Sequence, residues 1–172
     1  PMRTTASLLL LSLLYACDSP PPEQRSESAA DPWFVDEAAD RGIDFTWNSG
    51  AAGDLLMPEI IGGGAGVVDV DGDGDLDLYL VQARDGVNRL LRNDNGHFTD
   101  ITTDSGAGDA GYGMGLAVGD YDNDGDNDLY ITNVGPNVLL RNNGDGTFVD
   151  VTADAGVGDA GWGAGTVFAD VD

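Results

Sequence analysis

The stretch Asp69-Val70-Asp71-Gly72-Asp73-Gly74-Asp75-Leu76-Asp77 decides the fold, because the chain repeats it as Asp120-Tyr121-Asp122-Asn123-Asp124-Gly125-Asp126-Asn127-Asp128. Both copies fit the pattern D-x-D-x-D-G-x-x-D, and a leucine follows each of them. One loop rich in Asp and Gly is a weak signal, since an ordinary solvated turn has the same composition. Two full copies, separated by about 50 residues, indicate a repeated structural unit in which this loop has a fixed place.

The loop predicts a binding site for calcium, a hard cation that prefers six to eight oxygen ligands. Alternate residues can turn the carboxylates of positions one, three and five toward one centre, and the glycine at position six permits a sharp turn. The backbone carbonyl of position seven and the carboxylate of position nine complete the set. Such carboxylates would repel one another without a cation. The predicted ligands are Asp69, Asp71, Asp73, Asp75 and Asp77, then Asp120, Asp122, Asp124, Asp126 and Asp128.

Other metals and other calcium loops fit this pattern less well. Magnesium resists dehydration and rarely uses an all-protein cage, and zinc requires His or Cys, which neither loop contains. An EF-hand needs a bidentate glutamate at position twelve, where this chain has Leu80 and Ile131. The nine-residue calcium repeats of secreted toxins are excluded because their period is far shorter. Each loop is therefore expected to lead into a β-strand.

Other segments recur with the same period of about 50 residues, which is in the range of propeller blades. Residues 98–108 (FTDITTDSGAG) return as residues 148–158 (FVDVTADAGVG), and residues 34–42 (FVDEAADRG) are an earlier copy of their first part. The remaining pairs are residues 88–93 (NRLLRN) with 137–142 (NVLLRN), and residues 111–115 (GYGMG) with 161–165 (GWGAG).

Each repeat unit is expected to form four short strands and no helix. In the middle unit the predicted strands are residues 114–119, 128–133, 137–142 and 147–152. The turn Asn143-Gly144-Asp145-Gly146 has the composition of a hairpin between the third and fourth strands. One face of the first strand carries only Gly113, Gly115, Ala117 and Gly119. A strand with such a bare face is typical of a place where another backbone approaches closely.

These elements together resemble FG-GAP or VCBS repeats, which form the calcium-binding β-propeller also found in integrin α subunits. The LLRN and F-x-D-x-T elements are most similar to bacterial relatives of cartilage acidic protein, which often carry an ASPIC-type C-terminal domain. The resemblance covers residue 34 to the end. It implies an all-β fold of four-stranded antiparallel blades, a propeller of seven blades, and the same ten aspartates as ligands. Because the third loop stops after Asp170 and Asp172, we expect a partial third site and a fragment of the propeller.

The N-terminus has the features of an export signal. Arg3 supplies a positive charge, a short leucine-rich stretch follows, and Leu14-Tyr15-Ala16-Cys17 resembles the lipobox of bacterial lipoproteins. The apolar stretch is shorter than the roughly 20 residues that a membrane-spanning helix needs. We therefore predict a signal peptide over residues 1–16, lipidation of Cys17, a flexible tether over residues 17–32, and repeats over residues 33–172. The protein is expected in the bacterial cell envelope, held by its lipid.

The charge of the chain excludes one large class of partners. It has 31 acidic and 7 basic residues among 172, a formal net charge of -24. Nucleic acid is therefore excluded, because its phosphates would be repelled and no basic patch exists to hold them. Cys17 is the single cysteine, so no disulfide can form within the chain.

The predicted function is that of a binding or adhesion propeller with an unknown protein or glycan ligand, not that of an enzyme. The alternative is an accessory propeller of a larger secreted hydrolase whose catalytic domain lies outside this chain. The sequence contains no nucleophile elbow, P-loop or HExxH motif. The single histidine, His97, is expected in a surface turn. Trp47, Tyr112 and Trp162 are expected in packing, although stacking on sugars is open.

Overall fold

The computed structural model describes residues 33–54 and 56–170. The predicted signal peptide, Cys17, the tether and Asp172 lie outside these described residues. From Asp36 onward the chain forms one compact unit. Among the described residues, no helix is both long enough and apolar enough to span a bilayer.

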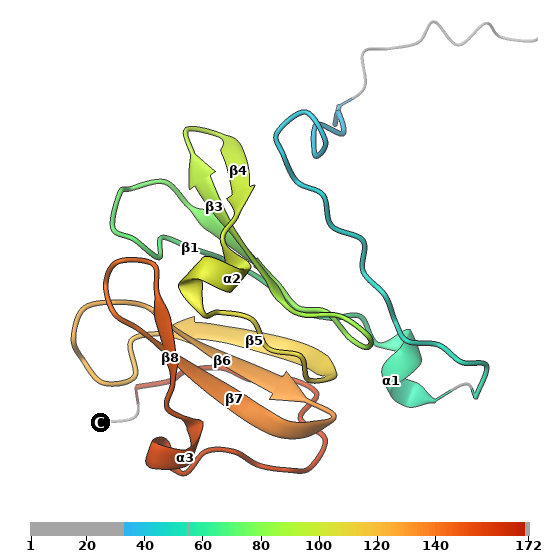
Figure 1. Cartoon of the computed structure of the whole chain (residues 1–172). Helices are drawn as coiled ribbons and strands as arrows, with labels where there is room; N and C mark the ends of the chain where they lie inside the picture. The colour runs from blue at the N-terminus through green and yellow to red at the C-terminus, as the bar shows by residue number, and fades with distance from the viewer. Residues whose placement is uncertain (1–32, 55, 171–172) are drawn as a thin grey trace, which may run out of the picture. The chain divides into compact units, whose positions relative to one another are not determined.

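Two four-stranded sheets form the fold, and both are antiparallel meanders (Figure 1). The first has the order β1-β2-β3-β4 and the second has the order β5-β6-β7-β8. The strands are β1 (Ala65–Val68), β2 (Asp77–Leu80), β3 (Arg89–Asp94), β4 (His97–Asp100), β5 (Gly113–Gly119), β6 (Asp128–Asn133), β7 (Gly135–Asn142) and β8 (Phe148–Asp150). The expected repeat of four-stranded all-β units is therefore confirmed.

The strands of the second sheet lie close to their predicted places. β6 agrees with the prediction at both ends, and β5 and β7 begin one and two residues earlier than predicted. The fourth strand is shorter, because Thr152 belongs to the one-turn helix α3 (Thr152–Ala155). The expectation of no helix was wrong here and at two other single turns, α1 (Met57–Ile60) and α2 (Thr102–Ser105).

The two helices α2 and α3 are equivalent parts of the repeat, and the same residues begin and end them. The carboxylates of Asp100 and Asp150 each accept the backbone N–H of the threonine that starts the helix, at 2.9 Å. Gly106 and Gly156 end the helices with φ of 72° and 70°, a conformation that favours glycine. In the earlier copy, Asp36 accepts the N–H of Ala38 at 3.1 Å, and residues 38–42 form a turn.

The β3–β4 and β7–β8 hairpins differ in length. Asn95 and Gly96 form a two-residue turn in the first, with φ of 56° and 87°, as a type I′ turn requires. The second hairpin has the predicted longer turn, in which Gly144 and Gly146 have φ of 78° and 76°. Asn143 closes it by donating its N–H to the Thr147 carbonyl at 2.9 Å.

The bare face of each first strand lies against a neighbouring backbone, as the sequence predicted. A Cβ atom on Gly64 would lie only 3.0 Å from the amide nitrogen of Leu116 in β5. One on Gly115 would lie 3.4 Å from the Cα atom of Gly165, and one on Gly119 would lie 2.8 Å from the ring of Phe168. The first strands β1 and β5 are therefore packed side by side through glycine, and β5 in turn meets Gly165 and Phe168 of the segment that follows α3.

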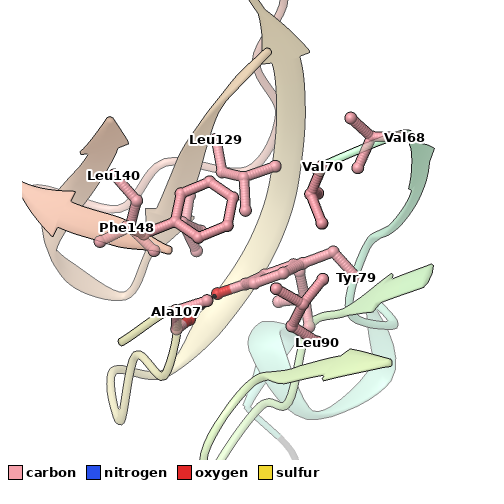
Figure 2. Packing of buried hydrophobic residues seen from close by; sticks show 10 residues of the cluster. Val68, Val70, Tyr79, Leu90, Ala107, Leu129, Leu140 and Phe148 are labelled. Carbon is pink, nitrogen blue, oxygen red and sulfur yellow. Dashed lines mark hydrogen bonds between the residues drawn. The ribbon is translucent and has the colours of Figure 1, made fainter. Parts of the chain in front are cut away.

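A single apolar core joins the two sheets. Figure 2 shows Val70, Tyr79 and Leu90 of the first repeat facing Leu129 and Phe148 of the second. Tyr79, Leu90 and Leu129 are fully buried. The Tyr79 hydroxyl donates to the Ala107 carbonyl at 2.8 Å, in the segment that links the two sheets. The second repeat therefore covers the apolar face of the first.

Candidate metal centres

The two Asp-rich loops occupy equivalent places, between the first and second strands of each sheet. Position nine of the loop pairs with the end of the first strand, as Val68 with Asp77 and Gly119 with Asp128. Position four is left-handed in both loops, with φ of 74° at Gly72 and 60° at Asn123. At position six, Gly74 and Gly125 have φ of 94° and 101°. Only glycine adopts such values easily, so the sharp turn predicted at position six is present.

The aspartate at position one organises the backbone of each loop. The two carboxylate oxygens of Asp69 accept the N–H groups of Gly72 at 2.8 Å and Gly74 at 3.1 Å. The carboxylate of Asp120 accepts those of Asp124 at 3.2 Å and Gly125 at 3.0 Å. The backbone of each loop thus wraps around this side chain through its own hydrogen bonds.

The aspartate at position nine is fully buried in both repeats. Asp77 accepts the N–H of Val70 at 2.9 Å and of Asn93 at 2.8 Å, one on each carboxylate oxygen. Asp128 is held in the same way by Tyr121 and Asn142, both at 2.9 Å. Burial raises the pKa of both carboxyls, although the backbone hydrogen bonds lower it and nearby aspartates add to the rise. A cation beside these carboxylates would offset the cost of keeping them charged in a buried place.

The carboxylates that converge are not the same set in the two loops. In the first, oxygen atoms of Asp69, Asp71 and Asp77 all lie within 4.8 Å of one another. In the second the converging set is Asp120, Asp122 and Asp124, all exposed. Oδ1 of Asp71 is buried and has no hydrogen-bond partner. An unpartnered buried carboxylate oxygen among other carboxylates fits a bound hard cation, which would supply the missing partner.

The side chains at position seven point elsewhere. Asp75 accepts the N–H of Asn95 at 2.7 Å, so its carboxylate holds the β3–β4 hairpin against the loop. The carboxylate of Asp126 lies beside Gly144 in the β7–β8 turn. At this position the backbone carbonyl therefore stays the expected ligand. At position five, Asp73 and Asp124 accept the N–H two residues later, at 2.8 Å and 3.0 Å.

The partial third loop is described only as far as Asp170. Together with Asp120, Tyr121, Asn123, Phe168 and Ala169, it lines a hollow of about 640 Å³ beside the second loop. Asp172 lies outside the described residues.

Comparison with known families agrees with this repeat geometry. A model described as FG-GAP-like repeat matches residues 69–131 and again residues 120–172, which together make up more than half of the chain. The chain belongs to the FG-GAP-like repeat family. The presence of such repeats suggests a β-propeller-like protein-binding domain. FG-GAP repeats are typically non-catalytic and often bind divalent cations. No curated protein matches the chain.

Two asparagines that support the FG-GAP loops were not predicted as functional. Asn93 donates its side-chain N–H to the Leu76 carbonyl at 2.9 Å, and Asn142 donates to the Asn127 carbonyl at 3.3 Å. Each asparagine therefore ties the end of the third strand to position eight of its own loop. In the sequence, each of them is the last residue of the recurring segment N-x-L-L-R-N. That recurrence alone did not indicate which residue the asparagine contacts.

The aromatic and histidine side chains singled out from the sequence lie at strand ends and connections. His97 is exposed at the start of β4. The Tyr112 hydroxyl donates to the Ser49 carbonyl at 2.8 Å, and the Val134 and Trp162 backbones form an isolated β-bridge. Trp47 and Trp162 expose 37% and 47% of their surface, so stacking on a sugar ring stays an open hypothesis.

Proposed function

We propose that this FG-GAP-like repeat protein binds one calcium ion in each complete loop. The observation that carries the proposal is the buried, unpartnered Oδ1 of Asp71 inside the cluster with Asp69 and Asp77. Carboxylate oxygens are the donors that calcium prefers, and its flexible coordination suits a set of side chains and carbonyls. The second loop has the same backbone turn and its own convergent carboxylates, which supports a second site.

Calcium would act here as a brace. It would neutralise carboxylates that repel one another and would fix the turn between the first two strands of each sheet. Magnesium fits less well because it keeps several waters and demands near-ideal octahedral geometry. Zinc would require nitrogen or sulfur ligands, and the described residues around the loops supply only oxygen.

We also propose that the sheets are blades of a propeller. In the first repeat Val70, Tyr79, Leu90 and Ala107 pack against the second repeat. The equivalent residues of the second repeat line a hollow of about 480 Å³, and those are Tyr121, Tyr130, Leu139 and Val157. A repeating apolar face of this kind supports serial packing of one blade on the next.

The propeller would serve as a binding module of the cell envelope. This proposal includes closure into seven blades, a protein or glycan ligand, export, and a lipid anchor at Cys17. The lipid is testable by expressing the full chain with an alkyne analogue of palmitate. The wild-type protein should become labelled and Cys17→Ser should not, whereas equal labelling of both proteins would contradict the anchor.

Thermal melting tests the calcium proposal. A site at about a hundred times its dissociation constant adds about 2.7 kcal/mol to the free energy of unfolding, so the melting temperature should rise clearly in calcium over EGTA. Magnesium at the same concentration should raise it less. Equal melting temperatures in calcium and EGTA would sink the proposal. The variant Asp71→Asn with Asp122→Asn is the matched control, and calcium should not stabilise it.

A further inference from the structure

The β7–β8 hairpin of the second repeat lies against the calcium loop of the first. The buried side chain of Asn142, the last residue of β7, donates to the Val70 carbonyl at 2.9 Å. A Cβ atom on Gly146 would lie 3.4 Å from the Cβ of Asp71 and 3.7 Å from the Cγ2 of Val70. Position three of the first loop is thus in contact with a turn that belongs to another repeat.

In the part of the chain that the structure describes, the first loop is the more buried of the two. Asp69 and Asp71 are half-buried, whereas Asp120, Asp122 and Asp124 are exposed. Of the two loops, both described in full, only the first has a carboxylate oxygen that is buried and without a hydrogen-bond partner. Such an oxygen is destabilising until a cation binds, and ionic attraction is stronger where water is excluded. An ion in the first loop would therefore gain from the cover that the hairpin provides.

We propose that the β7–β8 hairpin of the second repeat is the positioning cover of the calcium site in the first repeat. The inference rests on the proposed calcium binding. The ion of the first loop and the hairpin stabilise each other reciprocally, as linkage requires. Packing between the repeats is thereby coupled to the metal.

The hairpin offers a matched set of glycines for testing this coupling. Gly146 contacts the first loop, whereas a Cβ atom on Gly144 would lie 2.5 Å from Oδ2 of Asp126 in the second loop. A Cβ atom on Gly156 would have no other atom within 4 Å, so this glycine contacts neither loop. All three have φ between 70° and 78°, and a valine at any of them strains the backbone in the same way.

Calorimetric calcium titration separates the sites when each is measured alone. Asp122→Asn leaves the first site and Asp71→Asn leaves the second. With the first site alone, Gly146→Val should weaken binding about tenfold; with the second alone, the change should stay below about twofold. Gly144→Val should show the opposite preference, and Gly156→Val should affect neither site. Equal weakening of both sites by Gly146→Val, or an unchanged first site, overturns the inference.

Two further measurements keep the test decisive. If Gly146→Val does not fold, Gly146→Ala should give a smaller loss at the same site. In the Asp122→Asn chain, which keeps only the first site, calcium should slow hydrogen exchange of the amides of residues 143–147, and the further change Asp71→Asn should abolish that protection. Unchanged exchange contradicts the coupling. Absence of any calcium binding by the wild-type chain would refute the proposed function itself, whereas binding that ignores Gly146 refutes only this inference.

Discussion

Replacing Tyr79 by phenylalanine tests how the second repeat covers the first. The hydroxyls of Tyr79 and Tyr130 make the same hydrogen bond in their repeats, to the carbonyls of Ala107 and Val157, and both distances are 2.8 Å. Tyr79 and Ala107 are fully buried, whereas Tyr130 is half-buried. Tyr79→Phe leaves the Ala107 carbonyl unpaired where water cannot reach it, which costs about 2 kcal/mol. Tyr130→Phe should cost less than about 1 kcal/mol, because water can replace the lost donor.

Urea unfolding, followed by circular dichroism in calcium buffer, measures this difference. Both variants should keep the wild-type slope, so that the midpoint reports stability directly. In a separate thermal unfolding experiment, the melting temperature of Tyr79→Phe should be roughly 4–8 °C below that of the wild type. An equal cost for Tyr130→Phe and Tyr79→Phe would mean that the burial of the first interface has no energetic consequence, which would contradict this prediction.

Two other predictions concern the strand packing and the acid stability. Gly64→Ala should destabilise the chain by about 1–3 kcal/mol in denaturant melts, because its methyl would lie 3.0 Å from the backbone of β5; Gly62→Ala, with open space around it, should be nearly neutral. Burial alone would raise the pKa of the Asp100 carboxyl, but hydrogen bonds from Thr102 and the charge of Arg89 outweigh it and hold the pKa below its usual 3.8. The charged carboxylate therefore stabilises the fold at pH values above its usual pKa, and this contribution is lost as the pH falls through the lowered pKa. Melts between about pH 5 and pH 3 should show the stability difference between wild type and Asp100→Asn becoming smaller on acidification. A gap that widens on acidification would contradict this.

The strands and the loops could be predicted because the sequence repeats their local chemistry. Strands and hairpins are signalled by residues that are close in sequence, namely alternating apolar residues and Asn-Gly turns. Each short segment is ambiguous alone, and its recurrence in the next repeat removes the ambiguity. The one-turn helices were missed because four residues are too few to show a helical period. Their signal was instead the aspartate two residues before Thr102 or Thr152 and the left-handed glycine four residues after it.

The cover of the first loop could not be predicted from the sequence of the loop itself. Both loops carry aspartate at the same five positions, so each local pattern predicts the same site. That cover comes from Asn142 and Gly146, which are remote in sequence and reach the first loop only because the second repeat packs on the first. The orientation of Asp75 and Asp126 also depends on residues remote in sequence. Each carboxylate lies against the hairpin turn between the third and fourth strands of its own sheet.

Calorimetric titration of the metal-free chain with calcium tests the central claim most directly. Two ions should bind to each chain, one for each cluster of converging carboxylates. The variant with Asp71→Asn and Asp122→Asn should bind neither ion. No heat of calcium binding in the wild-type chain, or undiminished binding in the double variant, would contradict it.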